Sequence, residues 1–167
     1  LNGTTWTASR LPTGSQVRAF SGFGRAVSVE GDVACVGVIG GFGTDVNGEG
    51  GVAFYRRVNG TWTFQQGAPD AAGNNLGQSC DVNGGIAFVG RFSGVGGARV
   101  FARTAGATSD TWAVQADILD EQTPGSSVNV VGDTAFIGSG RRVLVRERGS
   151  NTWGPRQTID VAGRMRT

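Results

Sequence analysis

One loop of this chain carries oxygen-bearing side chains at alternating positions. Asp45, Asn47 and Glu49 are each separated by one residue and surround a glycine. Short loops of this kind bind hard cations such as Ca²⁺ through carboxylate and amide oxygens. These three residues are therefore the candidate metal ligands, and Ca²⁺ is the candidate cofactor. The alternative is a glycine-rich loop whose acids keep it soluble, and the single copy of the motif favours that alternative.

Two cysteines stand in otherwise apolar patterns. Cys35 occupies the position that Phe88 and Phe136 hold in related segments, and Cys80 occupies the position of Val27 and Val128. Both are therefore expected in the core. They form either a buried pair of free thiols or a disulfide, which requires Cβ atoms about 3.8 Å apart.

Histidine is absent from all 167 residues. Its absence excludes Ser-His-Asp and Cys-His catalysis and any histidine-ligated metal. Thirteen acidic residues remain, so a hydrolase with a carboxylate pair stays open on composition. A net charge of +2, with no nucleic-acid-binding motif, argues against a nucleic-acid partner. No apolar run is long enough for a transmembrane segment, and Leu1 begins no signal-peptide pattern, which is expected of a mature or excised segment.

The positions of the tryptophans show that the chain is a repeat. Trp6, Trp62, Trp112 and Trp153 each follow a threonine and a turn. A spacing of roughly 50 residues is the length of one supersecondary unit in a repeat protein. Most of the recurring residues are therefore expected to be structural.

Each unit predicts four strands. A segment with alternating apolar residues leads through a tight turn, where Asn83-Gly84 is the strongest hairpin signal, into an almost wholly apolar run. The alternating segments are 24–32, 77–85 and 125–133, and the apolar runs are 33–37, 86–90 and 134–138. A third strand and a Trp-bearing fourth strand follow, with Asn59-Gly60 as a type I′ turn. We expect each second strand to be buried on both faces and expect no helix.

These motifs resemble a known family. Phe23-Gly24, Gly31-Asp32, Phe54-Tyr55 and Gly60-Thr-Trp62 resemble the FG-GAP repeats of integrin-like β-propellers. The resemblance covers residues 21 to about 160 and is strongest in the first unit. In the second and third units Leu76-Gly77 and Pro124-Gly125 replace Phe-Gly.

The resemblance implies an all-β chain built of β-propeller blades. Residues 1–20 would be the outer strand of a preceding blade, and residues 21–74, 75–123 and 124–167 would be three four-stranded antiparallel blades. Propellers close with four to eight blades. We therefore expect one segment of a larger or multi-chain propeller, whose protein partners are further blades of the same protein or other copies.

The resemblance also implies a function and a compartment. It indicates a non-catalytic extracellular segment, secreted or at the cell surface, with a structural or adhesive role. The alternative is a carbohydrate-binding, lectin-like propeller that holds glycans at the loop of residues 38–50, and a hydrolase is third. An extracellular site favours a disulfide between Cys35 and Cys80 and glycosylation of the sequons at Asn2 and Asn59. The resemblance weakens the calcium hypothesis, because the family's cation loop joins the first and second strands of a repeat, and that connection is short in this chain.

Overall fold

The computed structural model describes residues 10–12, 17, 22–41, 49–71, 73–160 and 165–166. Every regular element within these residues is a β-strand, which confirms the all-β prediction. None of them forms a helix that could cross a membrane. Of the predicted N-terminal strand in residues 1–20, only 10–12 and 17 are described, and Trp6 lies outside the described residues.

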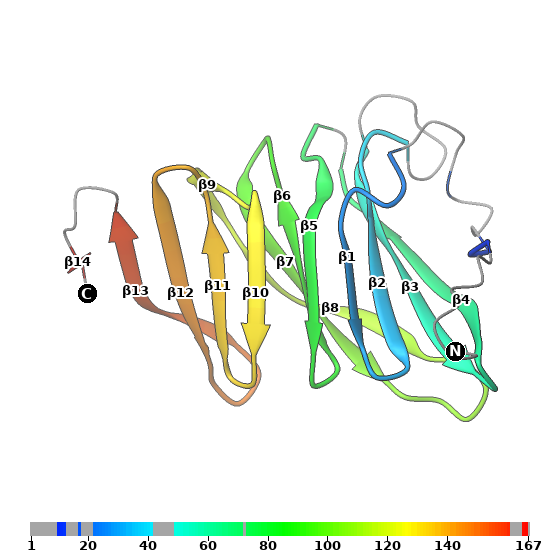
Figure 1. Cartoon of the computed structure of the whole chain (residues 1–167). Helices are drawn as coiled ribbons and strands as arrows, with labels where there is room; N and C mark the ends of the chain where they lie inside the picture. The colour runs from blue at the N-terminus through cyan, green and yellow to red at the C-terminus, as the bar shows by residue number, and fades with distance from the viewer. Residues whose placement is uncertain are drawn as a thin grey trace, which may run out of the picture.

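The strands form three sheets, one after another along the chain (Figure 1). The first sheet contains β1 (Val27–Glu30), β2 (Val33–Val38), β3 (Gly51–Val58) and β4 (Thr61–Pro69). The second contains β5 (Leu76–Asn83), β6 (Ile86–Arg91), β7 (Gly96–Thr104) and β8 (Thr111–Ile118), and β9 (Asp120–Pro124) pairs in parallel with β7. The third contains β10 (Ser127–Val131), β11 (Thr134–Gly138), β12 (Arg142–Arg148), β13 (Trp153–Asp160) and β14 (Met165–Arg166). Four consecutive antiparallel strands therefore recur three times.

Tight turns join the strands within each sheet. Asn59 and Gly60 have φ angles of 50° and 80°, as a type I′ turn requires at both positions. In the second sheet the turn lies on Gly84 and Gly85, with φ angles of 58° and 74°, while Asn83 ends β5. The predicted Asn83-Gly84 turn was therefore one residue too early. Two glycines adopt the left-handed conformation without the steric cost that a side chain brings.

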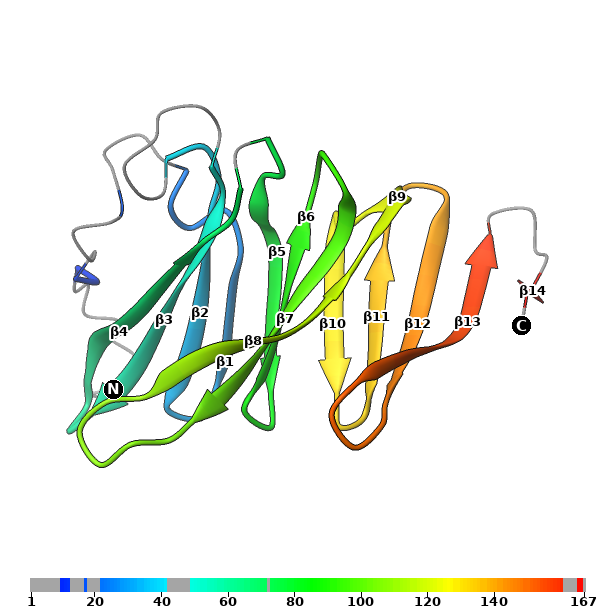
Figure 2. The same cartoon turned by 180° about the vertical axis from the view of Figure 1, so that it is seen from behind.

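The core lies between consecutive sheets. We call the face that each sheet turns toward the next sheet its forward face, and the opposite one its backward face. Phe54, on the forward face of the first sheet, stacks on Trp112 of the second with ring centroids 4.2 Å apart. Phe88, on the forward face of the second sheet, meets Trp153 of the third edge-to-face at 4.7 Å. The second sheet therefore lies between the other two (Figure 2).

The second strands differ in burial. All residues of β2 and β6 are buried, as predicted. The prediction is wrong for β11, where the Phe136 side chain is 41% exposed. Phe136 points from the forward face of the third sheet, and no further sheet covers that face among the described residues.

Candidate functional site

The loop predicted to bind Ca²⁺ is described only at its base. The backbone N–H of Gly41 donates to the carbonyl of Glu49 at 3.1 Å, which closes the loop. Asp45 and Asn47 lie outside the described residues, so the meeting of the three ligands stays a prediction. Within the described ranges, Asp, Glu and Cys residues form no group of three that could hold a metal ion.

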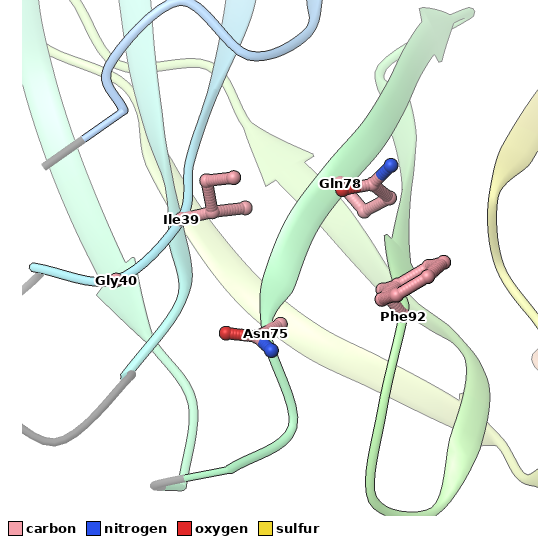
Figure 3. A pocket seen from close by; sticks show the side chains of 5 residues that line it. All are labelled: Ile39, Gly40, Asn75, Gln78 and Phe92. Atoms are coloured by element: carbon pink, nitrogen blue, oxygen red, sulfur yellow. The ribbon is translucent and has the colours of Figure 1, made fainter.

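A shallow pocket lies beside the base of this loop. Its volume is about 270 Å³, and it is lined by Ile39, Gly40, Asn75, Gln78 and Phe92. Ile39 and Gly40 follow β2, Gln78 lies in β5, and Phe92 follows β6. Figure 3 shows Ile39 and Phe92 on opposite sides, with Asn75 and Gln78 between them. The first and second sheets therefore both contribute to the pocket.

The lining combines an apolar surface with amides. The Phe92 side chain is 51% exposed, so its ring face is available to a ligand. Nδ2 of Asn75 donates to the Ser93 hydroxyl at 2.9 Å, and Oε1 of Gln78 accepts from Nε of Arg25 at 3.2 Å. Oδ1 of Asn75 and Nε2 of Gln78 have no partner among the described residues. One acceptor and one donor beside an aromatic ring suit a small polar ligand with an apolar face.

A buried ion-pair cluster anchors the segment that carries Asn75. Nε of Arg91 lies 2.5 Å from one Asp70 oxygen, and Nη2 lies 2.8 Å from Asp117. Arg99 bonds the same two carboxylates at 2.9 and 2.8 Å. The side chains of Arg91 and Asp70 are only 2% and 3% exposed. The buried charges of Arg91 and Asp70 thus have partners of opposite sign, as buried ions require, while Arg99 and Asp117 are partly exposed at 18% and 35%.

The pKa values of the two carboxylates follow from these contacts. Burial disfavours the Asp70 anion, but the hydrogen bonds from Arg91 and Ala71, with the charges of Arg91 and Arg99, outweigh burial and lower its pKa. The hydrogen bond from Arg99 chiefly lowers the pKa of Asp117, against the effect of burial. A catalytic acid needs a raised pKa near the working pH. The two carboxylates are therefore suited to stabilising ion pairs rather than to donating a proton in catalysis.

The sequence did not reveal this cluster. Asp70 lies just after β4, while Arg91 ends the apolar strand β6. A charged residue closing an apolar run was the only available signal, and it does not identify a partner 21 positions away.

The two cysteines meet between the first and second sheets. Both are buried free thiols, and Sγ of Cys80 donates to the carbonyl of Cys35 at 3.4 Å. The hydrogen bond with Cys80 and burial together raise the pKa of the Cys35 thiol. A raised pKa keeps the thiol protonated and unreactive. The expected burial of both cysteines is confirmed, and the disulfide between them stays a prediction.

Only one of the two predicted glycosylation sites lies within the described residues. Asn59 is exposed in the β3–β4 turn, a position open to a glycan. Asn2 lies outside the described residues.

In comparisons with known proteins, no family model and no curated protein matched this chain.

Proposed function

We propose that this chain is a non-catalytic, extracellular β-propeller segment with a structural or adhesive role in a surface or secreted assembly. The observation that carries the proposal is the serial packing of three sheets. In both interfaces the tryptophan of one sheet packs on an aromatic ring of the preceding sheet. Repeated packing of equivalent faces is what a radial stack of blades requires.

Contacts between the first strands of the three sheets, β1, β5 and β10, support the same architecture. Ser28 of β1 donates to Asp81 of β5 at 2.7 Å, and Asn129 of β10 donates to Asp81 at 2.9 Å. The first strands of the three sheets therefore lie beside one another and bond through side chains. This is the arrangement expected around a propeller axis.

The ion pairs between the first and second sheets also fit a structural role. The buried Asp110 bonds Arg103 at 2.8 Å and Arg56 of the first sheet at 3.4 Å. Together with the Asp70 cluster, these three residues join the first sheet to the second. Charged groups inside the molecule thus hold sheets together.

The test is the location and glycosylation of the native protein. An antibody raised against the chain should detect it on intact source cells or in the medium. In a secretory host, an endoglycosidase should increase the gel mobility of the wild-type chain, and Asn59→Gln should reduce that shift. Detection in the cytosol alone, with no glycosidase effect in the secretory host, would contradict the proposal.

The pocket favours a second candidate, which is glycan binding. Aromatic rings stack on the apolar faces of sugars, while amides bond hydroxyl groups. Phe92, Asn75 and Gln78 provide these groups in one hollow. On a glycan array, the wild-type chain should bind a reproducible set of sugars, and Phe92→Ala should lose them. Leu119→Ala is the matched control, because Leu119 is 57% exposed and does not line the pocket. Equal binding by wild type and Phe92→Ala would exclude this pocket.

A further inference from the structure

The chain contains four Asn-Gly pairs, and two of them lie within the described residues. Asn59-Gly60 joins β3 to β4, and Asn83-Gly84 lies where β5 turns into β6. An asparagine before a glycine is chemically labile, because glycine has no side chain to keep its backbone nitrogen from reaching the asparagine amide. Both pairs follow a valine, so they share the same local sequence and differ in their surroundings. Asn2-Gly3 and Asn47-Gly48 lie outside the described residues.

Every reacting group of Asn83-Gly84 is hydrogen-bonded. Nδ2 of Asn83 donates to Oε1 of Glu30 at 3.1 Å, and the backbone N–H of Gly84 donates to Oε2 of the same carboxylate at 2.7 Å. Oδ1 of Asn83 accepts the N–H of Gly132 at 3.0 Å. Glu30 belongs to β1, and Gly132 lies between β10 and β11. The first and third sheets therefore both hold this pair in place.

Asn59-Gly60 lacks such contacts. Asn59 is exposed, and neither its side chain nor the N–H of Gly60 has a hydrogen bond to another described residue. The turn follows the last residue pair of the β3–β4 ladder, Val58 with Thr61, and β4 lies at the edge of the first sheet. Local opening of this turn therefore separates little of the sheet.

We propose that Asn59 is a site of spontaneous deamidation and that its counterpart Asn83 is protected. The backbone nitrogen of Gly60 attacks Cγ of Asn59, and the side-chain nitrogen leaves as ammonia with the proton of the glycine N–H. A succinimide ring then joins the two residues. Water adds to either carbonyl of this ring and opens it to aspartate or to isoaspartate. The reaction needs water and no enzyme.

Both products change the turn. Each has a carboxylate in place of the amide, so the net charge of +2 falls by one. Isoaspartate also adds a carbon atom to the backbone of a two-residue turn. A type I′ turn fits its strands through a defined backbone twist, so the added atom should disturb the pairing of Val58 with Thr61.

Deamidation and glycosylation compete for the same nitrogen. A glycan would be attached to Nδ2 of Asn59 in the sequon that Thr61 completes, and deamidation removes this atom. A chain that deamidates first cannot be glycosylated at this position. The deamidation goes beyond the proposed function and does not depend on it, because the reaction needs no particular compartment.

Peptide mapping of the aged chain tests the proposal. The intact chain, made in a bacterial host without N-glycosylation, is kept at body temperature and mildly alkaline pH, and mass spectrometry follows each Asn-Gly pair separately. Asn59 should convert at least about ten times faster than Asn83, because freeing Asn83 breaks hydrogen bonds to a charged group. Electron-transfer fragmentation should find both aspartate and isoaspartate at position 59. Ion exchange should show a more acidic species that is reduced in Asn59→Gln.

Substitution of Glu30 tests the protection. Glu30→Ala should raise the rate at Asn83 about tenfold or more and leave the rate at Asn59 unchanged. Glu30→Gln keeps one acceptor oxygen and should give an intermediate rate. Circular dichroism verifies that each variant is folded before incubation.

The unfolded chain provides a control that needs no variant. In guanidinium chloride the two pairs should convert at similar rates, because both follow a valine and neither keeps its folded contacts. Equal rates at Asn59 and Asn83 in the folded chain would overturn the proposal. So would an Asn59 that stays intact in the folded chain while it converts in the denaturant. A folded Glu30→Ala chain in which Asn83 reacts no faster than in wild type would contradict the protection.

Discussion

Arg91 and Asp70 lie at the boundary between the first and second sheets, and both side chains are almost fully buried. Removing one member of a buried ion pair leaves the other charge without a partner, which costs far more than losing an exposed pair. The exposed pair of Arg57 and Asp32, with side chains 46% and 64% accessible, provides the comparison within the same chain. At the scale of single residues, burial decides which charges matter.

Asp70→Asn is expected to lower the free energy of unfolding by about 3–5 kcal/mol, because Arg91 and Arg99 lose a shared anion in a buried site. Asp32→Asn, the matched control, should cost about 0–1 kcal/mol. Urea denaturation followed by tryptophan fluorescence measures both. Equal effects of the two substitutions would show that the cluster contributes no more than a surface pair.

The same carboxylates predict how stability depends on pH. The folded-state pKa values of Asp70 and Asp117 are lowered, so the folded protein holds their protons less tightly than the unfolded chain does. Their contribution is complete above the unfolded pKa of about 3.9 and is lost as the pH falls through the folded values. Urea denaturation between pH 7 and pH 2.5 should therefore show a steep loss of stability in acid. Asp70→Asn should have a shallower acid slope, and an unchanged slope would contradict the assignment.

At the scale of elements, glycine columns set how closely consecutive sheets approach. Gly90 of β6 faces the backbone of Gly125, and no side chain fits between them. Gly154 of β13 has no atom within 4 Å of a built Cβ. Glycine is therefore required at position 90, whereas at position 154 a larger residue fits.

Gly90→Ala is expected to destabilise the protein by about 1–3 kcal/mol, since overpacking forces the second and third sheets apart. Gly154→Ala should be neutral or slightly stabilising, because alanine orders the unfolded chain more than glycine does. Thermal unfolding of the two variants against wild type makes the comparison. A loss of stability in Gly154→Ala as large as that in Gly90→Ala would refute the role of the interface.

Taken as a whole, the molecule is a stack held by contacts between sheets, and Cys35 and Cys80 meet at the first of these interfaces. Their thiols lie on different sheets, so a covalent bond there would cross-link two repeats. The raised pKa of Cys35 opposes spontaneous oxidation of the folded protein. We therefore expect the bond to form during folding rather than afterwards.

Refolding with oxidised glutathione should convert both thiols to a disulfide, with the glutathione reduced in exchange. Thiol titration should then find none. The cross-link should stabilise the protein by about 3–4 kcal/mol relative to the reduced form, through the restricted unfolded chain. Cys35→Ala is the control and should show no such gain. Two titratable thiols after refolding in the oxidant would contradict the prediction.

Much of this fold could be predicted from the sequence because its signals are local. Alternating residues defined the first strands, apolar runs defined the second, and Asn59-Gly60 defined a turn, since all of these depend on neighbours in the chain. The repeated positions also showed that Cys35 and Cys80 are core residues. Equivalence between units was enough for that, without any knowledge of geometry.

Other features depended on residues that are distant in sequence. The ion pair of Arg91 with Asp70 and the pocket between Ile39 and Phe92 exist only because the second sheet packs on the first. Phe136 follows the same local pattern as Phe88, yet one is exposed and the other is buried. The sequence by itself determined the strands and their repeat, because strand and turn preferences act over a few residues. Only the tertiary structure decided which faces are covered, because burial depends on which sheet lies opposite.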